Sequence, residues 1–207
     1  MSAYELPMEV QVGDTIYKIT DNGDYRMVID CFSALGDAEL SLQERLMSCI
    51  IIFYEDFNDV GDVLLCEDLQ ELIRQMYVFF NCGYVQKEQE TKSSTGPGKL
   101  IDWDQDAQLI CSAVNKVAGE EIRLKPYLHW WTFMGYYMAV DHSLLNIVAT
   151  IRSKILRGQN LEKQERQFRN ENPHYFVWNH KTVEQQEAEQ WVHEIWNSGK
   201  EVEDATN

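Results

Sequence analysis

One aromatic run limits what this chain can fold into more than any other part of its sequence: Pro126-Tyr-Leu-His-Trp-Trp-Thr-Phe-Met-Gly-Tyr-Tyr-Met138. On a helix over about 126–139, aromatic or methionine side chains would cover nearly the whole circumference. A helix that is apolar on all sides is normally buried among other helices. The run therefore predicts a helix at the centre of a helical bundle.

The same helix also carries the candidate partner-binding residues. In one interpretation its side chains only fill the core, which is the usual fate of such a helix. In the other, some of them line a groove in which a partner helix docks on aromatic and methionine anchors. The residues expected to bind a partner are Trp130, Trp131, Phe133, Met134, Tyr137 and Met138. The run alone leaves both interpretations open.

Apolar spacing predicts further helices on both sides of the aromatic run. Ser41-x-x-Glu44 is a capping box, whereas Asn81-Cys82-Gly83 and Gly119 are stop signals. The expected helices cover about residues 22–36, 42–57, 69–80, 102–118, 142–157, 160–171 and 181–197. Before them, Met8–Ile19 alternates apolar and polar residues around Gly13-Asp14, which predicts a hairpin. The expected fold class is mainly α: a helical bundle-like domain with a small N-terminal β-hairpin.

Composition divides the chain into four parts. Residues 1–83 are expected to hold the hairpin and an acidic helical part, and residues 101–172 an aromatic-rich helical part. Between them, residues 84–100 contain a stretch rich in serine, glycine and proline, which predicts a flexible linker or loop. Residues 173–207 are expected to form a C-terminal helix and a disordered tail.

The charge of the chain is strongly negative and uneven. The whole sequence carries −16, and residues 1–83 alone contain 16 acids and 4 bases, a net charge of −12. Such a surface repels nucleic acid and anionic lipid and attracts basic protein surfaces. We therefore expect neither nucleic acid nor membrane as a partner, although solubility alone would also explain the charge.

Cysteine usage and hydropathy predict a protein of the cytosol. The five cysteines are odd in number and well separated, as expected for small core residues in a reducing compartment. The N-terminus lacks the basic and apolar regions of a signal peptide. No apolar stretch approaches the roughly 20 residues that a membrane span requires.

The motifs that resemble metal or nucleotide sites fail on their spacing. Asp102-x-Asp104-x-Asp106 begins like an EF-hand loop, but Ala107 and Ala113 occupy the positions that require glycine and glutamate. Acids in the first turn of a helix, where the helix dipole favours them, explain this spacing better.

Other signatures of an enzyme are also missing from the sequence. The stretch from 93 to 100 lacks the first glycine and the final Ser/Thr of a phosphate loop. The five histidines show no metal-ligand spacing, and neither a nucleophile elbow nor a paired set of carboxylates stands out. We therefore expect no catalytic residue, cofactor or metal, and a protein that works by binding other proteins.

Four stretches together resemble the bacteriophage gene-product-fifteen family. They are Leu100–Ile110, Tyr127–Tyr137, Ile151-Arg-x-Lys154 and Leu161-Glu-Lys-x-Glu165. The resemblance covers roughly residues 5–172 and is strongest over 100–170, where the aromatic string is quite specific. Residues 174–207 extend beyond it.

The resemblance implies a role in the tail gene cluster of long-tailed phages and prophages of Gram-positive bacteria. It carries over no catalytic residue. It implies a tail assembly chaperone in the cytoplasm of the bacterial host, which binds the phage tape-measure protein and helps recruit the major tail (tube) protein. The alternative is a structural virion component, such as a tail-completion or connector protein. Self-association of the chain stays open.

Overall fold

The computed structural model describes residues 4–84 and 100–178, and 59% of these residues are helical. The expected fold class, mainly α with an N-terminal hairpin, is confirmed. The chain divides into two compact units, residues 1–150 and 151–207. The expected helix over 181–197, the tail and nearly all of the expected linker lie outside the described residues, so the four-part division stays a prediction.

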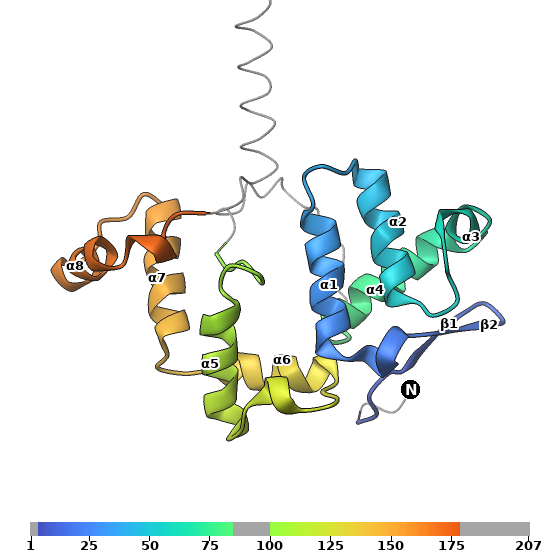
Figure 1. Ribbon diagram of the computed structural model, residues 1–207, viewed down its shortest axis with the longest axis horizontal. Helices are drawn as coiled ribbons and strands as arrows, with labels where there is room; N and C mark the ends of the chain where they lie inside the picture. Colours follow the sequence, from blue (N-terminus) through green and yellow to red (C-terminus); the bar gives the residue numbers. More distant parts are fainter. Residues whose placement is uncertain (1–3, 85–99, 179–207) are drawn as a thin grey trace, which may run out of the picture. The chain divides into compact units, whose positions relative to one another are not determined.

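The elements follow one another along the chain as coloured in Figure 1. Unit 1 contains β1 (Glu9–Val12), β2 (Thr15–Lys18), η1 (Thr20–Gly23), α1 (Tyr25–Gly36), α2 (Leu42–Phe53), α3 (Val60–Leu64), α4 (Leu69–Phe80), α5 (Ala107–Ala118), η2 (Ile122–Leu124) and α6 (Trp130–Met138). Helix α7 (Leu144–Leu156) contains the boundary, and unit 2 continues with α8 (Lys163–Glu171) and η3 (Pro173–Tyr175).

The hairpin forms where the alternating pattern predicts it. Strands β1 and β2 pair antiparallel, with Val12 opposite Thr15 across a turn in which Gly13 adopts a φ of +56°. Two strands alone are marginal in water. They are held because Val10 and Val12 are buried and because Tyr17 stacks on Phe57 at 5.9 Å.

The hairpin also explains why α2 is shorter than its apolar stripe predicts. The stripe runs to Phe57, yet α2 ends at Phe53 because Tyr54 turns to extended backbone and bridges to Ile19 beside the hairpin. The Tyr54 hydroxyl donates to the carbonyl of Leu72 on α4. The chain then forms α3, a short helix that the sequence pattern did not predict.

The acidic run before α5 forms a turn rather than the first turn of the helix. Asp102 accepts hydrogen bonds from the backbone N–H groups of Asp104 and Gln105, and α5 begins only at Ala107. The helix starts later than expected because an aspartate side chain can accept hydrogen bonds from nearby backbone N–H groups and so stabilise a turn in place of a helix. The buried Asp106 side chain accepts from the backbone of Asp102 and completes the turn.

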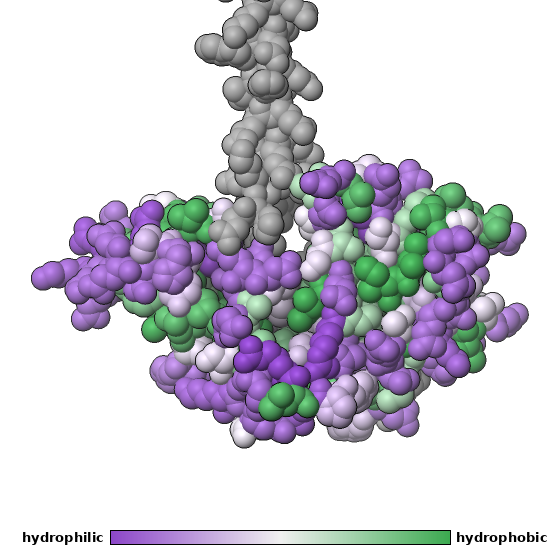
Figure 2. Space-filling model, viewed as in Figure 1, coloured by the Kyte–Doolittle hydropathy of each residue, from purple (hydrophilic) through white to green (hydrophobic). Residues whose placement is uncertain are grey.

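The core of unit 1 is rich in aromatic side chains. The largest fully buried ones are Trp130, Tyr54, Phe53 and Phe133. All five cysteines are free. No helix among residues 4–84 and 100–178 is long and apolar enough to cross a membrane. Figure 2 shows hydrophobic side chains in separate patches among hydrophilic ones, one of them over α3.

Candidate partner-binding surface

The candidate surface is built on α6, whose N-terminal end is fixed by His129. The Nδ1 atom of His129 accepts from the backbone N–H of Trp131 at 3.0 Å and so caps the helix. Its Nε2 atom lies 3.0 Å from the carbonyl oxygen of Pro7, which assigns the proton to Nε2. Burial lowers the pKa of His129, in keeping with a neutral ring that accepts at one nitrogen and donates at the other.

A buried aspartate ties the residues before α6 to the start of α1. Asp24 caps α1 by accepting from the backbone N–H of Arg26, and its second oxygen accepts from the backbone N–H of Leu128 at 2.8 Å. The guanidinium of Arg26 pairs with Asp24 and donates to the carbonyl of Lys125 at 2.7 Å. Segments about a hundred residues apart are thus joined, and α6 begins at Trp130 instead of near Pro126.

The two tryptophans of α6 attach the helix to the end of α4. The indole N–H of Trp130 donates to the carbonyl of Phe80 at 3.0 Å, and that of Trp131 donates to the carbonyl of Phe79 at 2.9 Å. Carbonyls in the last turn of a helix lack an intrahelical partner. The Trp130 indole supplies one for Phe80, whereas the Phe79 carbonyl also accepts from the backbone N–H of Cys82. Gly83 follows closely, since a Cβ there would lie 3.1 Å from the Trp131 ring.

Two of the six predicted residues belong to the core of this conformation. Trp130 and Phe133 are each 1% exposed, and their rings stack on one another at 5.5 Å. Phe133 also stacks on Tyr25 of α1 at 4.7 Å with nearly parallel planes. Trp131 is half-buried beside Phe79. These three side chains hold the helix in place.

The other three predicted residues lie together on the accessible part of α6. Met134, Tyr137 and Met138 have the i, i+3, i+4 spacing that places side chains on one face of a helix. Met134 and Tyr137 are half-buried, whereas Met138 is 64% exposed. The Tyr137 ring packs against Trp103, and burial raises its pKa, so the hydroxyl stays neutral. We call these three residues the α6 face.

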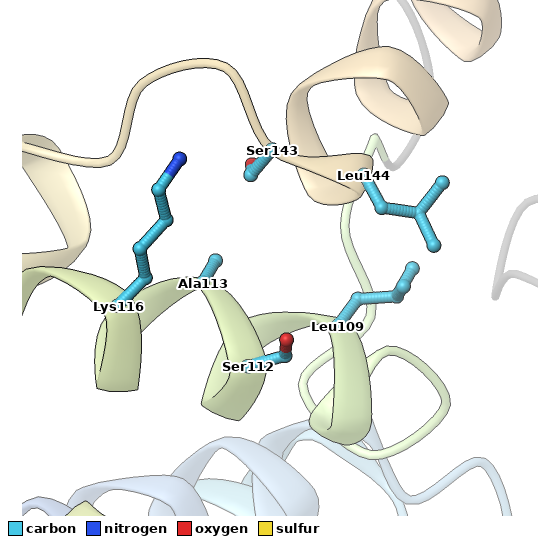
Figure 3. Close-up of a pocket in the computed structure, with 6 residues that line it drawn as sticks. All are labelled: Leu109, Ser112, Ala113, Lys116, Ser143 and Leu144. Carbon is cyan, nitrogen blue, oxygen red and sulfur yellow. The ribbon is translucent and has the colours of Figure 1, made fainter. Parts of the chain in front are cut away.

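A pocket that no sequence motif indicated lies just beyond this helix, between α5 and the start of α7. Its volume is about 240 Å³, and its lining residues are Leu109, Ser112, Ala113, Lys116, Ser143 and Leu144. Figure 3 shows Leu109 and Leu144 converging at one end and Lys116 standing at the other. The Lys116 ammonium donates to the carbonyl of His142 at 3.4 Å. We call this the α5–α7 pocket.

The pocket suits a single side chain of a partner better than a cofactor. Its volume lies below the roughly 300–1,000 Å³ typical of small-molecule sites. Two leucines and an alanine offer apolar contact, and the Ser112, Ser143 and Lys116 groups can orient a polar tip. Within the described ranges no group of three or more His, Cys, Asp or Glu residues could hold a metal ion.

Comparison with known proteins identifies the family. A family model described as Bacteriophage Gp15 protein matches residues 3–175, which is most of the chain. No curated protein and no solved structure matches. The match spans the hairpin, the aromatic helix α6, the α5–α7 pocket and α8. The chain therefore belongs to the bacteriophage Gp15 protein family, as the resemblance of its four stretches predicted.

Proposed function

We propose that this phage-related protein is a tail assembly chaperone. It binds the tape-measure protein of its phage in the cytoplasm of the bacterial host and helps bring in tail tube subunits. It acts by binding and carries out no chemical reaction. Family membership supports a phage role. The tape-measure protein as client is our proposal, drawn from the resemblance and from the apolar surface described above.

The observation that carries the proposal is the α6 face. A soluble protein normally buries a helix of this composition completely. Here Met138 is 64% exposed, and Met134 and Tyr137 are accessible beside it, although the other side of the helix is locked in the core. Methionine is unbranched and polarisable, so it adapts to partner surfaces of varied shape. Such a face suits a long helical client whose apolar seam presents many registers.

The α5–α7 pocket adds a second contact of the same kind. It can receive one apolar side chain of the client, as pockets at the centre of interfaces receive anchor residues. Binding should therefore depend mainly on apolar contact, with charge acting on the association rate. Raising salt from about 0.05 to about 0.5 M shortens the Debye length from about 14 to about 4 Å. An apolar complex should persist through this change.

Co-expression with the tape-measure protein and the major tail protein of the same phage tests the proposal. The wild-type chain should keep the tape-measure protein soluble and co-purify with it. The double variant Met134→Ser/Met138→Ser should lose the client while it keeps its fold, measured by circular dichroism and thermal melting. Leu124→Ser is the matched control, because Leu124 is 83% exposed on η2 and lies outside the α6 face.

Three outcomes separate this proposal from its rivals. Client binding retained by the Met134→Ser/Met138→Ser variant would show that the α6 face is not the contact surface. Absence of binding at any salt, with the tube protein present, would contradict the chaperone role. Mass spectrometry of purified virions decides the remaining alternative, since a chaperone should be abundant in lysate and missing from particles, whereas a structural component should be present at fixed copy number.

A further inference from the structure

An acidic and apolar surface surrounds α3 in unit 1. Val63 is fully buried and anchors this short helix, whereas three neighbouring side chains point to solvent: Val60 is 46%, Leu64 59% and Leu65 84% exposed. Figure 2 shows the hydrophobic patch in this region. Exposed acids flank it on both sides in the chain, namely Glu55, Asp56, Asp59, Glu67 and Asp68. We call these exposed residues the α3 face.

The charges of the α3 face have little compensation nearby. No lysine or arginine occurs in the sequence between Arg45 and Arg74. Arg74 is paired with Glu71, so it is not available to the other acids. The contacting strand β2 brings Lys18, whose backbone N–H donates to Asp56 but whose side chain makes no ion pair within the described residues. An exposed apolar patch with such a rim favours a basic, partly apolar partner.

Unit 2 carries a surface of the opposite charge on α8. Residues 151–178 contain 6 bases and 3 acids, a net charge of +3. Lys163, Arg166 and Arg169 recur at every third position of the helix, so they form a stripe along one side. All three are exposed and make no side-chain ion pair within the part of the chain that the structure describes. Ile155 and Leu156 of the same unit are also exposed.

Two acids at the start of α8 contact α7 rather than the basic side chains of their own helix. Glu165 pairs with Lys154 of α7 at 2.6 Å, and Glu162 lies 3.9 Å from the same ammonium. This pairing lowers the pKa of Glu165 and keeps it ionised. Glu162 and Glu165 are thus engaged with α7, whereas the three basic side chains are exposed and left to solvent. We call Lys163, Arg166 and Arg169 the α8 stripe.

We propose that the α3 face of one copy binds the α8 stripe of a second copy. The α3 face joins acidic charge to exposed aliphatic side chains, and the α8 stripe carries the opposite charge in a unit that also exposes Ile155 and Leu156. The contact joins two different surfaces of the chain, so it is heterologous. Nucleic acid is a poorer occupant of the stripe, because the chain carries −16 overall and repels phosphates. This self-contact is separate from client binding.

Charge reversal on each surface tests the proposal on purified full-length protein. The α3-face variant is Glu55→Lys/Glu67→Lys, and the α8-stripe variant is Arg166→Glu/Arg169→Glu; none of these four side chains makes a hydrogen bond or ion pair within the described residues. Asp30→Lys/Glu39→Lys is the matched control, since it changes net charge as the α3-face variant does but on exposed positions of another part of the acidic half. Circular dichroism confirms that each variant folds.

Sedimentation velocity over a range of concentrations gives the readout. The wild type and the control should grow in mass with concentration at about 0.05 M salt and fall to monomer at about 0.5 M, since screening removes the charge term. Each face variant alone should associate about tenfold more weakly or not at all, because like charges then meet. Mixing the two variants, or combining all four substitutions in one chain, should restore association, since opposite charges meet again.

Other results would overturn the proposal. A wild type that stays monomeric at every concentration would overturn it. The same result is expected if residues 179–207, which contain 7 acids and 2 bases, bind the α8 stripe in place of a second copy. Association that neither variant weakens would place the contact elsewhere. Variants that fail to recover on mixing would show that the two surfaces are not partners. None of these results depends on whether the tape-measure protein is bound.

Discussion

The two ends of α6 differ in how completely the fold uses their side chains. At the N-terminal end, the side chains of His129, Trp130 and Trp131 form hydrogen bonds with backbone carbonyls far away in the chain. Toward the C-terminal end, Met134 and Tyr137 are half-buried and Met138 is mostly exposed. A single helix of uniform composition therefore has a locked N-terminal end that supports the structure and an open C-terminal end that is exposed to solvent.

The largest effect is expected at the locked end, from Trp130→Ala. The substitution removes a fully buried ring and the hydrogen bond to the carbonyl of Phe80. It should lower the free energy of unfolding by about 3–5 kcal/mol, measured by urea denaturation. The comparison variant Met138→Ala should lower it by no more than about 0.5 kcal/mol, because that side chain is mostly exposed. Similar costs at both positions would remove the distinction between the ends.

A second test concerns the backbone at Gly23, which packs against His129 at the locked end of α6. Gly23 adopts a φ of +76°, and a Cβ there would lie 2.7 Å from the Phe79 ring and 3.1 Å from Nε2 of His129. Gly23→Ala should therefore cost about 2 kcal/mol from backbone strain and crowding. Gly119→Ala is the control, since Gly119 has a similar φ of +74° and open space around it. A cost at Gly23 no larger than that at Gly119 would mean that the crowding is relieved without loss.

The third expected effect is a pH dependence that belongs to the locked end alone. Burial lowers the pKa of His129 below the value of about 6.5 found in unfolded chains. The unfolded state then binds the proton more readily, so stability is complete above about pH 6.5 and falls as the pH drops through the folded pKa. A protonated ring would also lose its role as helix cap, worth about 1 kcal/mol.

The variant His129→Asn isolates this contribution. An asparagine oxygen can still accept from the backbone N–H of Trp131, but its side chain does not titrate. Melting temperatures measured between pH 7.5 and 5 should fall more steeply for the wild type than for the variant. The slope attributable to His129 disappears from the variant, while the contribution of the many carboxylates stays in both. Equal slopes would mean that His129 does not titrate in this range.

Part of the fold could be predicted from local patterns. The hairpin was predictable because the period of two around Gly13-Asp14 has one structural solution. The capping box at Ser41 and Glu44 and the apolar stripe of α4 likewise specify local structure without distant contacts. Family membership was predictable because the aromatic run is specific.

The rest depends on contacts between distant residues. Tyr54 leaves the helical stripe because its backbone bridges to Ile19. His129 can cap α6 because the carbonyl of Pro7, 122 residues away, accepts a hydrogen bond from its other ring nitrogen. On α6 the periodicity could not say which side is buried, since every side is apolar. Sequence reasoning therefore grouped the core residues Trp130 and Phe133 with Met138, and it missed the α5–α7 pocket entirely.

The smallest effect on stability, and the sharpest test of the open end, comes from Ser112→Leu. Ser112 is exposed on α5 and lines the pocket, so a leucine should occupy part of the space that a client side chain would enter. Leucine is also the better helix former, so the free energy of unfolding should rise by about 0.5 kcal/mol. Ser112→Ala gives a similar gain in helix propensity without filling the pocket, and it should bind the tape-measure protein as the wild type does. Pull-down of that protein by the two variants then separates stability from binding: weaker capture by Ser112→Leu alone supports the pocket as an anchor site, whereas equal capture by both variants would leave the α6 face as the whole of the proposed contact.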